Sequence, residues 1–343
     1  MRGVAAIGVV VLHQSGRFTH QYFPNGYFAV DFFFMLSGFV ISLAYQQRLD
    51  AGWPTGSFLR VRAIRLYPLY GLSMVIGIAA IILLRRLGEV HVSEARLVVS
   101  LVLGLLMLPA PYVFTAEGCF PFNYPAWSLF MEVVVNVIHA LFLRRRTMKF
   151  LGTVVLFSGA IFVVTAVKAG TTDIGYMNRQ IVWLYGFSRV VFGYVVGMML
   201  FRVWKAGKRR IRMPVAVQLI LLIAVMAVPI DGPLKLLYQF LIIFGIFPGL
   251  VLAGATASLG PRLAVVADLV GRASYAIYVL HVPMLPFVRG VWRHVSGHAI
   301  EVDAPWGGLF YVVFILGLAL LLDEVYDAPM RRFLLKKFTP KPA

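Results

Sequence analysis

The chain has 343 residues, of which 60% are apolar and 13% are charged, and 32 Lys and Arg against 14 Asp and Glu give it a net charge of +18. A disordered basic tail needs low hydrophobicity, and a soluble nucleic-acid-binding protein would not have a mean hydropathy of +0.85, so both classes are excluded. This combination is typical of an integral membrane protein whose charges lie in its loops. The single cysteine, Cys119, excludes a disulfide framework and a thiolate metal site.

Apolar stretches alternate with basic clusters along the whole chain. Eleven stretches are candidate membrane spans: residues 3–16, 26–47, 67–84, 97–115, 127–143, 150–167, 181–201, 213–230, 234–256, 273–290 and 307–322. The basic clusters are Arg48 with Arg60, Arg62 and Arg65; Arg144 to Arg146; Arg202 to Arg212; Arg262 with Arg272; and Arg331 to Lys337. Because short cytoplasmic loops collect Lys and Arg, all five clusters are predicted to be cytoplasmic.

This assignment requires an even number of crossings between the clusters at Arg60 and Arg144, but three apolar stretches lie between them. One of them therefore does not cross. Pro109 and Pro111 break a helix and favour 97–115 as the irregular segment, whereas Arg85 and Arg86 leave 67–84 as the alternative.

The sequence thus predicts an all-α, polytopic transmembrane helix bundle forming one domain over residues 1–343. About ten helices span the membrane, one further segment is irregular or re-entrant, and both termini are cytoplasmic. The first span is short, because residues 3–16 rise only about 21 Å against a hydrocarbon core of roughly 30 Å. Either the true start lies upstream of Met1, or this helix opens into a polar cavity.

Arg2 and His13 are the first ionisable pair inside an apolar stretch. Eleven helical steps amount to three turns plus roughly 20°, so both side chains share one face and lie about 16 Å apart along the axis. This arrangement suits a long ligand with an anionic head at Arg2 and a reactive tip at His13. The alternative is an interfacial anchor and a histidine that is hydrogen-bonded within the bundle.

Two carboxylates also lie in apolar sequence. Asp31 stands among aromatic residues, and a desolvated carboxylate there needs a cation or a proton donor, for which His13 or an arginine is available. Glu132 lies one turn into another span. It is either a general acid or base, or the partner of an arginine such as Arg189.

Further polar residues form short motifs. Ser37-Gly38 favours close helix packing. Tyr278 and His281 are three residues apart and share a helix face, which is expected to point into the bundle as a hydrogen-bond network or as part of a catalytic site.

Arg62 and Arg65 likewise share a face. They are either part of a positive-inside cluster or, because the guanidinium fork binds phosphate bidentately, an anion site. No metal-ligand spacing is present in the sequence.

In this order, the motifs resemble those of the acyltransferase-3 family of integral membrane acyltransferases. Arg2, ten residues and His13 match its first-span hallmark, and GYFAVDFFFMLSGF from Gly26 resembles its second-span motif. The remaining matches are RAIRLYPLY with Arg62 and Arg65, PAWSLFMEV with Trp127, Ser128 and Glu132, and SYAIYVLHVP with Ser274, Tyr278 and His281. The resemblance covers nearly the whole chain.

The resemblance implies transfer of an acyl group, acetyl above all, from cytoplasmic acyl-CoA to a hydroxyl of a sugar in a cell-envelope or exported polysaccharide or glycolipid. Acyl-CoA is then a co-substrate, and no metal is needed. The implied site residues fall into three groups: catalytic His13, Glu132 and Asp31; acyl-CoA-binding Arg2, Arg62 and Arg65; and substrate-binding Trp127, Ser37, Tyr278 and His281.

The expected location is the inner, or plasma, membrane, and the expected partners are acyl-CoA, a carbohydrate acceptor and the bilayer, with no nucleic acid. A homo-oligomer or an envelope-biosynthesis complex is a further expectation.

The alternative functions are an acyltransferase acting on a small molecule such as a macrolide or a lipid, a proton-coupled transporter, and a non-catalytic partner in envelope synthesis. No internal repeat of the kind found in transporters is present in the sequence.

Overall fold

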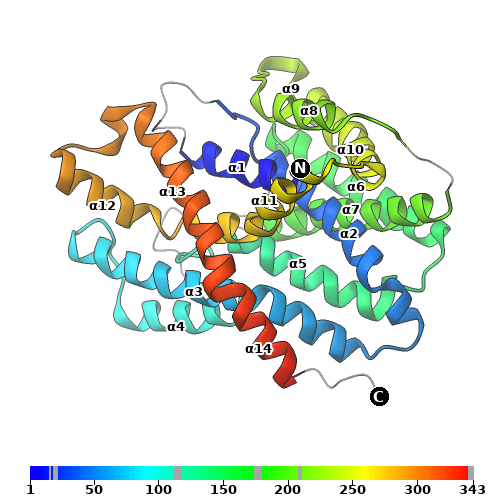
Figure 1. Cartoon of the computed structure of the whole chain (residues 1–343), viewed down its shortest axis with the longest axis horizontal. Coiled ribbons are helices and arrows are strands. Elements are labelled where there is room, and N and C mark those ends of the chain that lie inside the picture. The colour runs from blue at the N-terminus through cyan, green and yellow to red at the C-terminus, as the bar shows by residue number, and fades with distance from the viewer. Residues whose placement is uncertain (15–16, 18–21, 112–117, 174–179, 208–210, 339–343) are drawn as a thin grey trace. The chain divides into compact units, whose positions relative to one another are not determined.

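The computed structural model describes residues 1–343 except 15–16, 18–21, 112–117, 174–179, 208–210 and 339–343. Throughout the described residues the regular elements are helices (Figure 1). Contacts group the chain into two compact units, each assembled from separate segments. Unit 1 comprises Met1–Gly8, Phe23–Leu59 and Met131–Asp268, and unit 2 comprises Val9–Tyr22, Arg60–Phe130 and Leu269–Ala343. The boundaries fall within α1 (Arg2–His13), α3 (Thr55–Arg86), α5 (Ala126–Ile138) and α11 (Pro261–Leu280).

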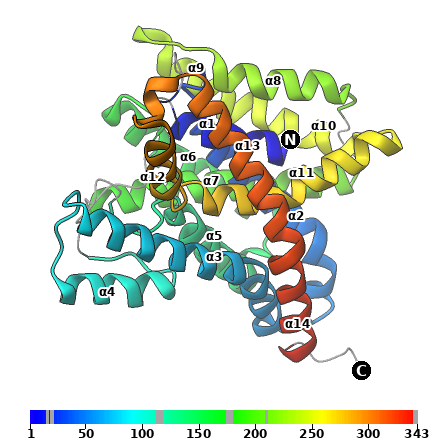
Figure 2. The ribbon, with the colours of Figure 1, turned by 60° about the vertical axis from the view of Figure 1, so that its left-hand side comes forward.

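Unit 1 is organised around α7, which packs against both α2 and α6 (Figures 1 and 2). A short π-helical segment, η2, extends α5, and another, η4, joins α9 to α10. The remaining elements of this unit are α2 (Phe28–Asp50), η2 (His139–Leu143), α6 (Met148–Ala169), α7 (Gln180–Lys205), α8 (Val215–Ala227), η3 (Gly232–Leu234), α9 (Lys235–Leu241), η4 (Ile242–Ile246) and α10 (Phe247–Thr256).

Glycines allow α2 and α7 to approach closely. A Cβ at Gly38 of α2 would overlap the carbonyl oxygen of Tyr194 in α7, and a Cβ at Gly197 of α7 would overlap the carbonyl oxygen of Met35 in α2. In a lipid bilayer, helices associate mainly through van der Waals packing, and small residues let their backbones approach closely. The packing role that the sequence favours for Ser37-Gly38 therefore has a direct geometric basis at Gly38.

Replacing Gly197 by Ala is expected to destabilise the protein by about 1–3 kcal/mol, because the added methyl group must push two helix backbones apart. Gly152→Ala in α6 is the matched control, since no atom lies within 4 Å of the Cβ position there. Thermal unfolding in detergent should show a lower midpoint for Gly197→Ala than for Gly152→Ala. Equal midpoints would contradict close packing at Gly197.

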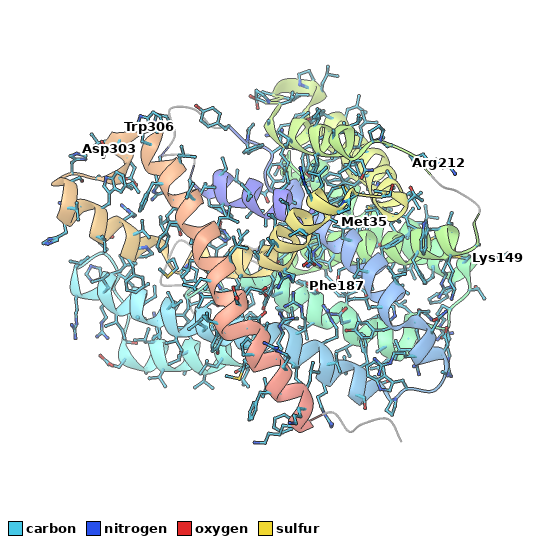
Figure 3. The ribbon with its side chains drawn as sticks, in the orientation of Figure 1. Met35, Lys149, Phe187, Arg212, Asp303 and Trp306 are labelled. Atoms are coloured by element: carbon cyan, nitrogen blue, oxygen red, sulfur yellow. The ribbon has the colours of Figure 1, made fainter. Side chains whose placement is uncertain are left out.

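In unit 2, α4 lies beside α3 (Figures 1 and 2). Tyr67 and Tyr70 of α3 donate hydrogen bonds to the carbonyl oxygens of Leu105 and Gly104 at the end of α4. Figure 3 labels Asp303 and Trp306, which mark the connection into α13. The remaining elements are α4 (Glu94–Leu105), α12 (Leu285–Ser296), η5 (Ile300–Asp303), α13 (Trp306–Leu322), the π-helical segment η6 (Asp323–Asp327) and α14 (Ala328–Phe338).

The helix lengths agree with a polytopic membrane protein. Among the described residues, eight helices are long and apolar enough to cross a membrane, and α1 and α8 are shorter apolar helices. The number of helices that cross, expected to be about ten, and the side of each terminus stay predictions. α4 has 12 residues and rises about 18 Å, less than a core of roughly 30 Å. This length supports the interpretation of 97–115 as the irregular segment, of which residues 112–115 lie outside the described residues.

The predicted span over 273–290 is wrong in position. α11 begins at Pro261 and ends at Leu280, turns follow at residues 281–284, and α12 starts at Leu285. Pro283 accounts for the break, because proline disfavours helical backbone at the residue before it. Arg262 and Arg272, expected in a loop, are in α11.

Candidate active site

Helix α1 carries both members of the first predicted pair. It runs from Arg2 to His13, so the two residues are the first and last of one 12-residue helix. The spacing places them on one face, about 16 Å apart along the axis. Arg2 is exposed and His13 is half-buried.

In unit 2, His13 faces the second predicted histidine. The Nδ1 atom of His13 lies 2.9 Å from the Nε2 atom of His281, and the two rings are stacked with centroids 5.0 Å apart. Tyr124 meets the His13 ring edge-on at a centroid distance of 5.1 Å. His281 is fully buried. We call His13 and His281 the histidine pair.

The hydrogen bonds of the histidine pair determine which ring nitrogens carry protons. The carbonyl oxygen of Tyr278 can only accept, so the Nδ1 atom of His281, 2.7 Å away, donates to it. In a neutral imidazole the Nε2 atom of His281 is then an acceptor, and the Nδ1 atom of His13 must donate to it. The Nε2 atom of His13 therefore keeps its lone pair, as a general base or a nucleophile requires.

The surroundings of His281 hold it in this orientation. The hydroxyl of Tyr311 donates to the carbonyl oxygen of His281. The hydroxyl of Tyr278 lies 2.7 Å from the Oγ atom of Ser128, at the start of α5. Trp127, the preceding residue, is buried in the same turn. The late motif and the Trp-Ser motif, which are 150 residues apart in sequence, are thus joined within one unit.

Several residues of this region were missed by sequence reasoning. Asn123 donates to the carbonyl oxygen of Val279 at 2.9 Å and to Ser73 Oγ at 3.0 Å, which ties the turn before α5 to α11 and α3. Its position between Pro121 and Pro125 could have marked it as a polar residue in a rigid turn. Tyr311, in the middle of an apolar run, gave no comparable signal.

Gln14, directly after His13, was also missed. Its side chain is fully buried, and neither its amide oxygen nor its amide nitrogen has a hydrogen-bond partner among the described residues. Buried polar groups are nearly always hydrogen-bonded, so an unpartnered amide next to His13 needs an explanation.

Asp31 in unit 1 meets an arginine. Its carboxylate accepts two hydrogen bonds from Arg189, at 2.6 Å from Nε and 2.7 Å from Nη2, and both side chains are buried. Arg189 also donates to the carbonyl oxygen of Tyr27, and Asp173 lies 3.9 Å from it. Burial raises the pKa of the Asp173 carboxyl, and the Arg189 guanidinium opposes this shift. Asp31 was predicted to meet a cation, and this cation is Arg189. From the sequence, Arg189 was a possible partner of Glu132.

Glu132 lies next to another predicted residue. The Oγ atom of Ser37 in α2 donates to the Oε1 atom of Glu132 in α5, at 2.9 Å. Unit 1 thus brings Ser37 and Glu132 together, and it brings Asp31 and Arg189 together as a separate pair.

The two predicted arginines of α3 lie in unit 2. Arg62 and Arg65 are half-buried and three residues apart on this helix. The guanidinium of Arg65 contacts Asp327 at 3.3 Å and lies over the ring of Tyr275 at 5.6 Å. Within the described residues, no group of three or more His, Cys, Asp or Glu is arranged to hold a metal ion.

Comparison with known proteins identifies the kind of protein that carries this arrangement. Residues 1–324 match the acyltransferase-3 family, described as an acyltransferase domain. The chain is 41% identical to "Protein 2 in picA locus" of Rhizobium radiobacter over 177 residues, which are 49% of this chain and 92% of that protein. No solved structure matches the chain. With its polytopic helices and a family match that covers nearly its whole length, the chain belongs to the acyltransferase-3 family and is a multi-pass membrane acyltransferase.

Proposed function

We propose that the protein is an O-acetyltransferase of the cytoplasmic membrane that uses cytoplasmic acetyl-CoA. Its proposed acceptor is a hydroxyl group of a sugar in a cell-envelope or exported polysaccharide or glycolipid. The observation that carries the proposal is the 2.9 Å contact between the Nδ1 atom of His13 and the Nε2 atom of His281, from which we infer a lone pair on the Nε2 atom of His13. Ester formation from a thioester needs a base of this kind to activate a hydroxyl near neutral pH.

The proposed reaction is a direct transfer. Nε2 of His13 takes the proton of the acceptor hydroxyl while the acceptor oxygen attacks the thioester carbonyl carbon. The carbon–sulfur bond then breaks, the CoA thiolate leaves, and the His13 imidazolium returns the proton to it. The products are an acetyl ester and CoA thiol, so the base is regenerated. The amide of Gln14 is a hydrogen-bonding group available to the thioester carbonyl.

We assign the donor to the cationic residues at the predicted cytoplasmic side. Arg2 and His13 lie at opposite ends of α1. In acetyl-CoA a long arm separates the phosphates from the thioester, so the phosphates can lie near Arg2 while the thioester lies near His13. Arg62 and Arg65 supply further guanidinium groups, whose planar forks suit phosphate oxygens. This role places the N-terminal end of α1 at the cytoplasmic face.

The other predicted residues receive different roles. The carboxylate of Asp31 is occupied by Arg189, so we propose that it positions α2 against α7 and takes no part in the proton transfer. We propose that Ser37 with Glu132 contacts the substrates. Tyr278 orients His281, and Trp127 packs beside Ser128, which hydrogen-bonds to Tyr278.

The test of the function is an acetyl-transfer assay. Membranes from a host strain lacking this protein, with or without the protein restored, are incubated with acetyl-labelled acetyl-CoA and the host's glycans. We expect alkali-labile label on sugar hydroxyls only where the protein is present. Label at the level of the protein-free membranes would contradict the function. Label recovered on a lipid or a small molecule instead would identify the alternative acceptor class, and a transporter would give no covalent product.

His281 is expected to act through His13, so its replacement should be sensitive to hydrogen-bonding capacity. His281→Ala removes the acceptor that fixes the His13 tautomer, and kcat is expected to fall about 10- to 100-fold. His281→Gln offers an amide oxygen to the Nδ1 atom of His13 and should recover most of this loss. Equal losses for Ala and Gln, at equal protein stability, would contradict the positioning role.

A further inference from the structure

A group of charged residues surrounds the π-helical segment η6, where α13 continues into α14. Asp323 contacts Arg272 at 3.2 Å and Arg331 at 3.3 Å. Asp327 contacts Arg331 at 2.9 Å and Arg65 at 3.3 Å. Two carboxylates therefore hold three guanidinium groups from α3, α11 and α14, all within unit 2. We call these five residues the arginine cluster.

Burial differs between the two kinds of charge. The side chains of Asp323 and Asp327 are 7% and 1% exposed, whereas those of Arg331, Arg65 and Arg272 are 22%, 29% and 48% exposed. The carboxylates thus contact the guanidinium groups from the interior, and the three arginine side chains are partly exposed.

The charges of the cluster do not cancel. The three guanidinium groups and two carboxylates of the cluster leave one positive charge, Glu324 of η6 is a further exposed carboxylate, and additional cations lie on α3 and α14. Arg60 of α3 donates to the carbonyl oxygen of Phe338 at 2.7 Å, which brings the end of α14 and its Lys336 and Lys337 toward α3. A polyvalent anion is the ligand that complements such an excess.

Contacts besides the ion pairs position Arg65. The guanidinium of Arg65 lies over the Tyr275 ring at 5.6 Å, and the hydroxyl of Tyr275 donates to the carbonyl oxygen of Leu66 at 2.6 Å. The Oδ1 atom of buried Asp327 has no hydrogen-bond partner among the described residues, so this carboxylate is not a saturated structural contact. Fixing donors in advance lowers the entropy that binding must overcome.

We propose that Arg65, Arg272 and Arg331 form the binding site for the phosphates of CoA, and that Asp323 and Asp327 are the positioning residues of this site. The diphosphate and the 3′-phosphate of CoA supply several anionic oxygens, and guanidinium binds such groups bidentately. The inference rests on the proposed use of acetyl-CoA and adds Arg272, Arg331 and the two aspartates to it. None of these four residues stands out in the sequence motifs.

The test measures equilibrium binding of labelled CoA to the purified full chain in phosphatidylcholine nanodiscs. Arg272→Ala with Arg331→Ala is expected to weaken binding roughly tenfold or more, because charge-assisted contacts to phosphate are lost. Asp327→Asn should weaken it as well, by releasing Arg65 and Arg331 from their orientation. Arg85→Ala is the matched control, because Arg85 forms an exposed ion pair with Glu94 at the other end of α3. Unchanged CoA affinity in the double variant would overturn the inference.

A second measurement, the KM for two acetyl donors, distinguishes a role of the arginine cluster in binding CoA from a purely structural role. The KM for acetyl-CoA should rise in the double variant, while the KM for S-acetyl-N-acetylcysteamine, a thioester without phosphates, should change less than about twofold. Equal rises for both donors would overturn the inference in favour of structural damage. An effect seen only in vesicles containing phosphatidylglycerol would assign the cluster to lipid headgroups. If no acetyl transfer occurs with any donor, the proposed function fails, but the CoA-binding measurement still decides this inference.

Discussion

Replacing His13 by alanine is expected to lower the rate of acetyl transfer by about three orders of magnitude, the loss that follows when a general base is removed. Among the described histidines, His13 is the one whose Nε2 atom is assigned as a base by the hydrogen bonds of the histidine pair. CoA affinity should change little, because we propose that the imidazole lies at the thioester end of the donor, away from the CoA phosphates. The measurement is the initial rate with saturating acetyl-CoA in proteoliposomes that contain equal amounts of folded protein.

His91→Ala is the control for this substitution. His91 is an exposed residue between α3 and α4, and the same chemical change there should leave the rate within about twofold of the wild type. Equal transfer by His13→Ala and wild-type protein would remove His13 from the reaction.

Breaking the Asp31–Arg189 pair is expected to have the largest effect on stability. Arg189→Met leaves the Asp31 carboxylate buried without its bidentate partner, and removal of one member of a buried ion pair costs about 3–5 kcal/mol. Asp31→Val should be as harmful, because it leaves the guanidinium buried. The double variant Asp31→Val with Arg189→Met should recover much of the loss, since apolar side chains of similar size can replace a buried pair.

The measurement is the midpoint of thermal unfolding in detergent, together with acetyl transfer by whatever protein remains folded. Arg85→Ala breaks an exposed pair and should shift the midpoint very little, because exposed ion pairs contribute about 0–1 kcal/mol. If both single variants unfold at the same temperature as Arg85→Ala, the structural role of the pair is wrong. A double variant that is stable but inactive would instead give Asp31 a chemical role.

The sequence predicts the architecture well because its signal is local. Hydropathy and the positions of Lys and Arg identify the helices of a polytopic bundle, and helical spacing places Arg2 and His13 on one face of α1. The error at 273–290 has a local cause too. A hydropathy window follows apolar content, whereas α11 includes Arg262 and Arg272 and ends before Pro283, so the true helix begins twelve residues earlier than the apolar stretch.

Pairing between distant residues was not predictable in the same way. His13 and His281 are 268 residues apart, and spacing gives no information on contacts between separate helices. For Asp31, the sequence predicted that the desolvated carboxylate needs a cation, but it did not identify which one. The packing of α2 on α7 identifies it as Arg189. Asp323 and Asp327 were missed because each resembles an ordinary charge at the end of an apolar helix. Their ion pairs are formed with arginines from α3, α11 and α14, which the sequence does not place near them.

We propose that His13 performs the transfer with a tautomer fixed by His281. The most direct test is a double-mutant cycle of acetyl-transfer rates among wild type, His13→Ala, His281→Ala and the double variant. Because His281 acts only through His13, the double variant should transfer acetyl at the rate of His13→Ala alone, within about twofold. If the two reductions multiply, His281 contributes independently of His13, and the account of the histidine pair is wrong.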